Sequence, residues 1–291
     1  MKAIFRNRYI PYFFIAPQII ITLLFFIWPA LTAFKQSFFL QDAFGLRHHF
    51  VWLKNYYFLF TSHYYWHSII ITLIYSLAVS IFTLIFALFI ATLANRTIRA
   101  GGVYKSLFIW PYAVAPAIAG ILWRFLFNPA IGLITYLLSK VGYNWNYVLN
   151  GHQALLLIII AAVWQQFSYN FLFFLAGLQS IPKSLLEAAA IDGAGPFKRF
   201  YHIVLPLLSP TTFFLLIMNL IYAFFNTFGI VQIITKGGPA YATNIMVYKV
   251  YNDGFVGMNF GSSAAQSVIL MLVVIALTVL QFKYIERRVH Y

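Results

Sequence analysis

One apolar segment followed by one polar loop decides how this chain folds. Residues 154–178 read ALLLIIIAAVWQQFSYNFLFFLAGL, and residues 179–206 continue as QSIPKSLLEAAAIDGAGPFKRFYHIVLP. The first segment has no charged residue, and it is longer than the about 20 apolar residues with which a helix crosses a hydrocarbon core. The second contains acidic, basic and glycine residues. We therefore expect a transmembrane helix that leads directly into a loop outside the membrane.

The same absence of charge recurs along the whole chain. Only 8% of the 291 residues are charged and the mean hydropathy is +0.84, whereas a soluble domain has about 25% charged residues. Each predicted span is centred on a stretch without charge. The spans cover about residues 11–34, 69–94, 106–127, 154–178, 207–234 and 262–282. The sequence therefore predicts an all-α integral membrane protein with six transmembrane helices in a single domain, residues 1–291.

The basic residues predict the orientation, because Lys and Arg near short loops resist translocation. Twelve of them fall on one predicted side: Lys2, Arg6, Arg8, Arg96, Arg99, Lys105, Lys183, Lys198, Arg199, Lys283, Arg287 and Arg288. Seven fall on the other: Lys35, Arg47, Lys54, Arg124, Lys140, Lys236 and Lys249. Both termini are therefore predicted to be cytoplasmic. The net charge of +14 follows from topology, and we expect no nucleic acid partner.

The loop at residues 179–206 has a local pattern of its own. Residues 184–191 are good helix formers, and the following residues 192–195 contain two glycines that break the run. Pro196 suits the first turn of a second helix, which we expect to stop before Pro206. Two readings are open: a hairpin lying on the membrane surface without a partner, or a hairpin that binds another protein.

A spaced motif favours the second reading. Glu187, Ala188 and Ala189 precede Gly193, and Ile203, Leu205 and Pro206 follow at set distances. This pattern resembles the EAA signature of the membrane subunits of binding-protein-dependent ABC importers. In that family the loop docks on the ATP-binding subunit. The resemblance assigns the coupling role to Glu187, Ala188, Ala189, Asp192 and Gly193, with Glu187 as polar contact and Gly193 as the corner.

Other segments are similar to the carbohydrate-type permeases of the same family, and in particular to those of sn-glycerol-3-phosphate importers. These include residues 111–116, 169–174, 237–239 and 264–267. The resemblance implies a type I ABC importer permease fold in the bacterial cytoplasmic (inner) membrane. It also implies a second permease subunit, two ATP-binding subunits and a solute-binding protein as partners, with lipid around the chain. ATP and Mg²⁺ would bind the partner subunits, and this chain would bind no cofactor.

Several classes of function are disfavoured by what the sequence lacks. It contains no G-x-x-x-x-G-K-[ST] phosphate-binding motif, no metal-ligand pattern and no catalytic arrangement of nucleophile and base. All five acidic residues lie outside the charge-free stretches, although ion-coupled carriers usually place ionisable groups inside the membrane. We therefore expect a permease that is not an enzyme, with an ion-coupled secondary carrier as a distant alternative.

Polar side chains within the spans are candidates for a translocation path, because such groups are costly towards lipid. Spacing places them on single helix faces: Asn219, Tyr222 and Asn226; Gln165 with Tyr169; Gln166 with Asn170; and Gln266. The alternative for each is a hydrogen bond that only holds helices together. Arg124 is the one basic residue beside a span that could meet a phosphate, and otherwise it is an interfacial anchor. Because the path is neutral, a neutral sugar or oligosaccharide is the alternative to sn-glycerol 3-phosphate and glycerophosphodiesters.

Overall fold

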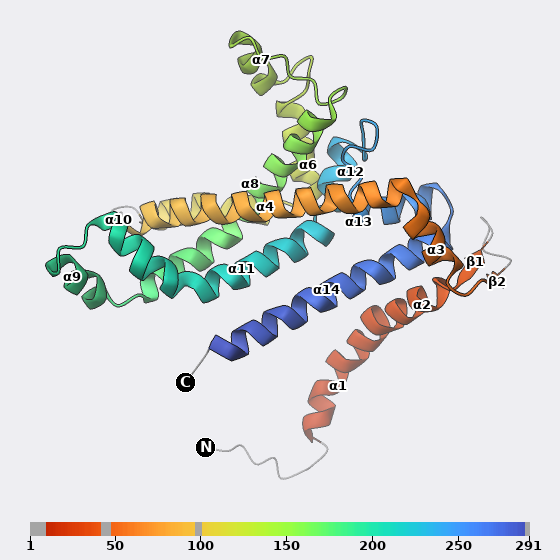
Figure 1. Cartoon of the computed structure of the whole chain (residues 1–291), viewed down its shortest axis with the longest axis horizontal. Coiled ribbons are helices and arrows are strands. Elements are labelled where there is room, and N and C mark those ends of the chain that lie inside the picture. Colours follow the sequence, from red (N-terminus) through yellow and green to blue (C-terminus); the bar gives the residue numbers. More distant parts are fainter. Residues whose placement is uncertain (1–9, 42–47, 97–100, 289–291) are drawn as a thin grey trace. The chain divides into compact units, whose positions relative to one another are not determined.

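The computed structural model describes residues 10–41, 48–96 and 101–288 (Figure 1). It divides into two compact units, which are considered separately here. The smaller unit comprises residues 1–63 and 250–272, and the larger unit comprises residues 64–249 and 273–291. Lys2, Arg6, Arg8, Arg47 and Arg99, which contribute to the predicted orientation, lie outside the described residues. The orientation across the membrane and the assignment of one permease domain stay predictions.

The smaller unit begins with a long apolar helical segment. It consists of α1 (Ile10–Thr22), a π-helical turn η1 (Leu23–Ile27) and α2 (Trp28–Gln36). In the most apolar 18-residue window of Tyr12–Gln36, no side chain is buried within the chain. An apolar helix that buries none of these side chains against the described residues is compatible with a span whose side chains face lipid.

A short hairpin and helix follow in the same unit. Strand β1 (Phe39–Gln41) pairs antiparallel with β2 (His48–Phe50), so that Phe39 faces Phe50, and α3 (Lys54–Thr61) comes next. Asn55 Nδ2 donates hydrogen bonds to the carbonyl oxygens of Ser37 (2.8 Å) and Phe39 (3.0 Å). The unit also contains η3 (Asn252–Val256) and the beginning of α14 (Phe260–Arg288). The prediction of an all-helical chain missed this small hairpin.

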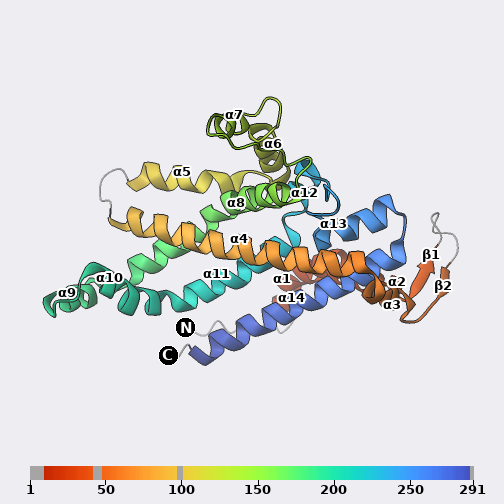
Figure 2. The same ribbon diagram turned by 45° about the horizontal axis from the view of Figure 1, so that its top comes forward.

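The larger unit is built around α8, as Figures 1 and 2 show. Its elements are α4 (His63–Arg96), α5 (Gly101–Ala113), α6 (Pro116–Leu126), α7 (Leu133–Lys140), α8 (Gly151–Ser180), α9 (Lys183–Ile191), α10 (Pro196–Arg199), η2 (Phe200–Val204), α11 (Leu205–Phe225), α12 (Phe228–Ile234) and α13 (Met246–Tyr251). The Asn150 side chain caps α8 by accepting hydrogen bonds from the backbone of His152 and Gln153. Helix α8 then packs against α5, α6, α11 and α12.

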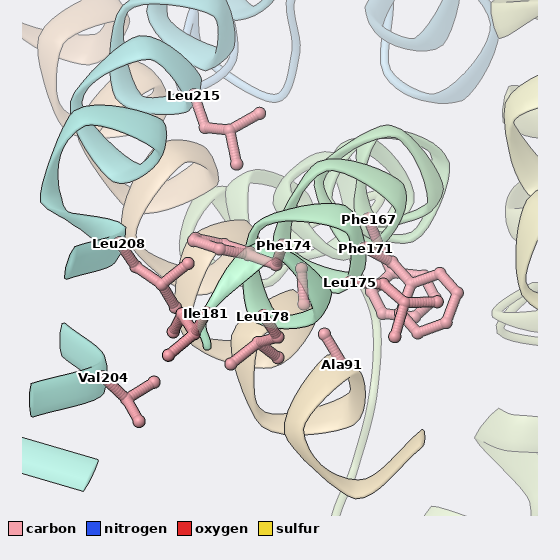
Figure 3. Close-up of a cluster of buried hydrophobic side chains, with 11 residues drawn as sticks. Ala91, Phe167, Phe171, Phe174, Leu175, Leu178, Ile181, Val204, Leu208 and Leu215 are labelled. Atoms are coloured by element: carbon pink, nitrogen blue, oxygen red, sulfur yellow. The ribbon is translucent and has the colours of Figure 1, made fainter. Parts of the chain in front are cut away.

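A cluster of buried apolar side chains joins α8 to its neighbours (Figure 3). Phe174 of α8 lies towards Leu208 of α11, whereas Phe171 lies beside Phe167 on another side of α8. Ala87 and Ala91 of α4 belong to the same cluster. Small residues let neighbouring backbones approach closely, and in a membrane such packing, more than exclusion of water, holds helices together. The cluster therefore fixes the helices to which the loop at residues 179–206 is attached.

Among the described residues, five helices are long and apolar enough to cross a membrane, and a sixth span is present if one bent pair counts as a span. The bent pair is α5 and α6, which meet at 104° where we expected one straight span. Ala115 is extended (φ −60°, ψ 142°) because it precedes Pro116, which disfavours helical geometry in the residue before it. The third span is thus broken near its middle.

The expectation that the second loop helix stops before Pro206 was wrong. Helical structure runs from Pro196 through η2 into α11. The π-helical turn of η2, at Phe200–Val204, lies immediately before Pro206. A widened turn accommodates a proline that lacks the N–H for a regular bond and whose ring crowds the preceding turn. The helix ends instead at Phe225, and α12 starts separately at Phe228.

Candidate functional site

The loop at residues 179–206 forms a hairpin of two short helices, α9 and α10, with a glycine at its corner. Gly193 has φ +80° and donates from its backbone to the Ala190 carbonyl (3.1 Å). The next residue, Ala194, donates to the Ala189 carbonyl (2.9 Å). This pair of bonds is the Schellman arrangement that ends helices at a left-handed residue, for which glycine has no steric cost.

Most of the hairpin surface is free to meet a partner. Glu187 and Asp192 are exposed, and neither side-chain carboxylate makes a hydrogen bond or ion pair within the described part of the chain. Two large apolar side chains flank the corner: Ile191 is 87% exposed and Phe197 is 80% exposed. Apolar side chains on a polar, glycine-containing loop are typical of a surface that another protein covers.

The hairpin is nevertheless held firmly at its base. Leu186 of α9 packs against the buried cluster shown in Figure 3, which includes Ile181 and Val204. Arg199 Nη1 donates to the Leu186 carbonyl (3.2 Å), so α10 is tied to α9. Figures 1 and 2 show α9 and α10 at the end of α8 and α11 opposite to α12. A force on the hairpin therefore acts directly on two long helices.

The break between α5 and α6 borders a cavity of about 390 Å³, referred to here as the neutral cavity. Its wall comes from this break, from α8 and from the C-terminal end of α11. None of its described lining residues is charged. Its polar side chains are Tyr112, Gln165, Gln166, Tyr169, Tyr222 and Asn226. Four of the residues predicted to line a path, Gln165, Tyr169, Tyr222 and Asn226, are therefore brought together.

Gln165 connects the three parts of this wall. Its Nε2 donates to the Val114 carbonyl, which the helix break leaves without a regular helical partner. Its Oε1 accepts a hydrogen bond from the Tyr222 hydroxyl (2.9 Å). A broken helix is tolerated inside a membrane protein when such side chains satisfy the freed backbone groups. Gln165 and Tyr222 thus give the wall its shape.

Other polar groups of the neutral cavity are not paired with each other. Gln166 is 5% exposed, and its side chain makes no hydrogen bond within the described residues. Tyr112 and Tyr169 stack, with 5.7 Å between ring centroids and 29° between ring planes. Asn226 caps α11 and is exposed. These side chains leave amide and hydroxyl groups free to bind a polar ligand.

Asn170 and Asn219 lie elsewhere and bind each other. Each Nδ2 donates to the other residue's Oδ1, at 2.8 and 2.9 Å, and Asn170 also donates to the Gln166 carbonyl (3.0 Å). Both side chains are fully buried and neither lines the neutral cavity. The structure therefore places these two predicted path residues in a clamp between α8 and α11.

Gln266 belongs to the smaller unit, where it is also fully buried. Its Nε2 donates to Asp253 Oδ2 (2.7 Å) and to Ser262 Oγ (3.2 Å). These bonds hold the beginning of α14 to η3. Its predicted role in the path stays a prediction.

Arg124 lies at the C-terminal end of α6, where its Nη1 donates to the Ile233 carbonyl of α12 (3.0 Å). It lines a second cavity of about 270 Å³, which is also lined by Lys236, Tyr147 and Thr235. This cavity, referred to here as the cationic cavity, carries two basic side chains. Sequence reasoning passed over Lys236 because it considered only basic residues next to a span.

Comparison with known protein families matches residues 61–291 to the family described as binding-protein-dependent transport system inner membrane component. The chain belongs to this family. It is a multi-pass permease subunit of a bacterial ABC importer. The EAA resemblance at the α9–α10 hairpin led to the same family from the sequence alone.

Relatives from several bacteria match the permease over nearly its full length. A protein of Brucella abortus biovar 1 (strain 9-941) is 56% identical over 290 residues, covering 100% of this chain and 99% of the relative. A protein of Pectobacterium atrosepticum is 53% identical, with 100% and 98% covered. Both relatives bear the name sn-glycerol-3-phosphate transport system permease protein UgpA.

Solved structures confirm the predicted fold of an ABC importer permease. A chain of a bacterial ABC transporter involved in the import of the acidic polysaccharide alginate has a TM-score of 0.81 at 21% identity, covering 97% of this chain and 96% of that chain. The alginate transporter has also been determined in complex with its alginate-pentasaccharide-bound periplasmic protein, with a TM-score of 0.79 at 21% identity, covering 94% and 92%. At these identities the likeness concerns the fold.

Proposed function

We propose that this permease subunit moves sn-glycerol 3-phosphate, and glycerophosphodiesters, into the bacterial cytoplasm. The observation that carries the cargo assignment is the 53–56% identity, over essentially the whole chain, to relatives named as sn-glycerol-3-phosphate permeases. Two basic side chains, Arg124 and Lys236, line one cavity and supply the positive charge that a phosphate ester needs.

The energy for import comes, in this proposal, from a partner. The exposed α9–α10 hairpin docks on an ATP-binding subunit, with Ile191 and Phe197 as apolar contacts and Glu187 as a polar contact. Closure of two such subunits on ATP and Mg²⁺ moves the hairpin, and its anchored base moves α8 and α11. A rigid element seated in a moving partner transmits that movement to the helices attached to it.

Alternating access then opens the path first to the outside and then to the cytoplasm. A solute-binding protein delivers the cargo outside, and a second permease subunit supplies the other half of the path. The chain lies in the inner membrane with both termini and the hairpin in the cytoplasm, as the twelve basic residues on that side predict. The neutral cavity, with Gln165, Tyr169, Tyr222 and Asn226, lies on the path. The permease itself binds no cofactor in this scheme.

A neutral sugar or oligosaccharide is the second candidate cargo, because one observation favours it. The lining of the neutral cavity consists of amides, hydroxyls and apolar groups without a cation. Such a site suits hydroxyl groups better than a dianion.

Reconstitution of the complete transporter in proteoliposomes tests the proposal. ATP inside and the binding protein outside are expected to drive uptake of labelled sn-glycerol 3-phosphate, whereas vesicles without the ATP-binding subunits show none. Uptake of a neutral sugar and not of glycerol 3-phosphate would replace the first candidate by the second. Uptake by the permease alone under an ion gradient would overturn the ATP-driven mechanism.

A further inference from the structure

The neutral cavity is lined by a side-chain amide that makes no hydrogen bond to the described residues. Gln166 is 5% exposed and lines the cavity, yet its side chain makes no hydrogen bond within the described part of the chain. Its neighbour Gln165, by contrast, uses both its nitrogen and its oxygen. The polar atoms of Gln166 are therefore accessible from the cavity, where an amide offers both a donor and an acceptor to a polar ligand.

The surrounding groups indicate the chemistry of that ligand. The Tyr112 and Tyr169 rings stack on one wall and carry two hydroxyls, and Asn226 adds a second free amide. Amides and hydroxyls both donate and accept hydrogen bonds, as do the hydroxyls of a polyol. The cavity volume of about 390 Å³ lies within the range of small-molecule sites, about 300–1,000 Å³.

A phosphate group lacks complementary partners in the same place. No described lining residue is charged. The N-terminus of α6 is the remaining source of positive potential, but its first residue, Pro116, has no N–H. The backbone N–H of the next residue, Ala117, is close to Gly229. A Cβ added to Gly229 would lie 3.0 Å from the Ala117 nitrogen. A dianion in this cavity would lose hydration without gaining a charge partner.

We propose that the neutral cavity is the subsite for the uncharged, hydroxyl-bearing end of the cargo, bound through Gln166, Asn226 and Tyr169. The phosphate lies outside this cavity and takes its positive charge from elsewhere, with Arg124 and Lys236 of the cationic cavity as the source in this chain. This inference rests on the proposed function, because it names the part of the glycerol phosphate that the permease reads.

A cargo that lacks both hydroxyls tests the role of Gln166. In the complete reconstituted transporter, initial uptake is measured for sn-glycerol 3-phosphate and for propyl phosphate, which lacks both hydroxyls. Gln166→Leu is expected to lower kcat/KM for the first about tenfold, the effect of a lost neutral hydrogen bond in a closed site, and to change the second little. The binding protein is the same in both measurements, so its own preference cancels in the ratio. An equal loss for both cargos would overturn the proposal.

A negative charge introduced at Asn226 provides a second, independent test that requires only sn-glycerol 3-phosphate as cargo. Asn226 is exposed, so Asn226→Asp carries a negative charge, whereas Asn226→Leu is neutral and similar in size. A carboxylate still accepts hydrogen bonds from hydroxyls, so we expect Asp to retain more uptake than Leu. If the phosphate lies in this cavity instead, repulsion makes Asp the worse variant by tenfold or more. That order would overturn the proposal even if the deoxy cargo is not carried.

Two controls separate the possible failures. Variants are compared only after co-purification with the partner subunits shows equal assembly and basal ATP hydrolysis. A wild-type transporter that takes up no glycerol 3-phosphate refutes the proposed function itself. A wild-type transporter that is active, with Gln166→Leu unchanged for both cargos, refutes only the subsite.

Discussion

In the α9–α10 hairpin, Glu187 and Asp192 lie exposed and form no ion pair with any described residue, whereas in the neutral cavity Gln165 bonds both Val114 and Tyr222. The hairpin presents its apolar residues Ile191 and Phe197 outward as well. The difference teaches where each region obtains its stability. In our proposal a partner covers the hairpin, so variants of the hairpin should affect coupling. The cavity wall is held by its own hydrogen bonds, so variants there should affect the permease itself.

The largest effect is expected from Gly193→Val. The left-handed backbone at Gly193 costs a residue with a Cβ about 1–2 kcal/mol, and more if it is β-branched, although space around the glycine is open. We expect coupled ATP hydrolysis to fall tenfold or more while the protein stays in the membrane. Gly195→Val is the matched control, because Gly195 has φ −65° and equally open space. Normal coupled turnover of Gly193→Val would contradict the role of the corner.

Breaking the clamp between α8 and α11 should lower the stability of the isolated permease subunit, measured in the absence of its partner subunits. Asn170→Leu leaves the fully buried Asn219 amide without its partner, which costs about 1–2 kcal/mol. The measurement is the thermal unfolding midpoint of the purified subunit in detergent. Replacing both asparagines by leucine should recover part of the loss, because no buried amide then stays unpaired. Equal midpoints for wild type and Asn170→Leu would show that the clamp adds nothing.

Truncating the exposed apolar residues of the hairpin should weaken binding of the ATP-binding subunit and leave the stability of the permease unchanged. Ile191→Ala and Phe197→Ala are each expected to weaken binding of the ATP-binding subunit by about 1 kcal/mol or more, as for anchors at a protein interface. The unfolding midpoint should not change, because these side chains are 87% and 80% exposed. Val141→Ala, at a side chain that is 78% exposed and far from the hairpin in the sequence, is the control. A lower unfolding midpoint together with unchanged binding of the ATP-binding subunit would show that these side chains stabilise the permease and do not contact the partner.

The smallest effect is expected at the cationic cavity. Arg124 keeps a hydrogen bond to Ile233 and shares the cavity with Lys236, so Arg124→Gln removes only one of two charges. We expect KM for sn-glycerol 3-phosphate to rise about threefold, since a partly exposed charge pair contributes about 1 kcal/mol or less, with a larger rise in Arg124→Gln/Lys236→Gln. Unchanged uptake in the double variant would remove this cavity from the path.

The structure of the α9–α10 hairpin could be predicted almost completely. Its helix formers, its glycine corner and its proline start are local signals, and the structure has two helices around Gly193 at φ +80°. The continuation of the second hairpin helix into α11 could not be predicted, because a proline such as Pro206 usually marks the end of a helix. The π-helical turn at Phe200–Val204 that accommodates it leaves no plain mark in the sequence.

For the polar residues of the spans, by contrast, the partners of each side chain could not be predicted from the sequence. Helical spacing grouped Asn219 with Tyr222 and Asn226, yet Asn219 pairs with Asn170 while the other two line the neutral cavity. Spacing gives the face of one helix, but which neighbour covers each turn of that face depends on where the helices cross. The break at Ala115 also turns α6 away from α5 and opens the cavity between them.

By itself, the sequence determined the helical membrane class, the approximate spans and the family, because absence of charge and motif spacing are local properties of the chain. Only the tertiary structure decided which polar side chains satisfy each other and which stay free. Gln165 and Gln166 are adjacent and chemically identical, but they lie at different angles around α8. One therefore meets Val114 and Tyr222, and the other lines the neutral cavity without a partner.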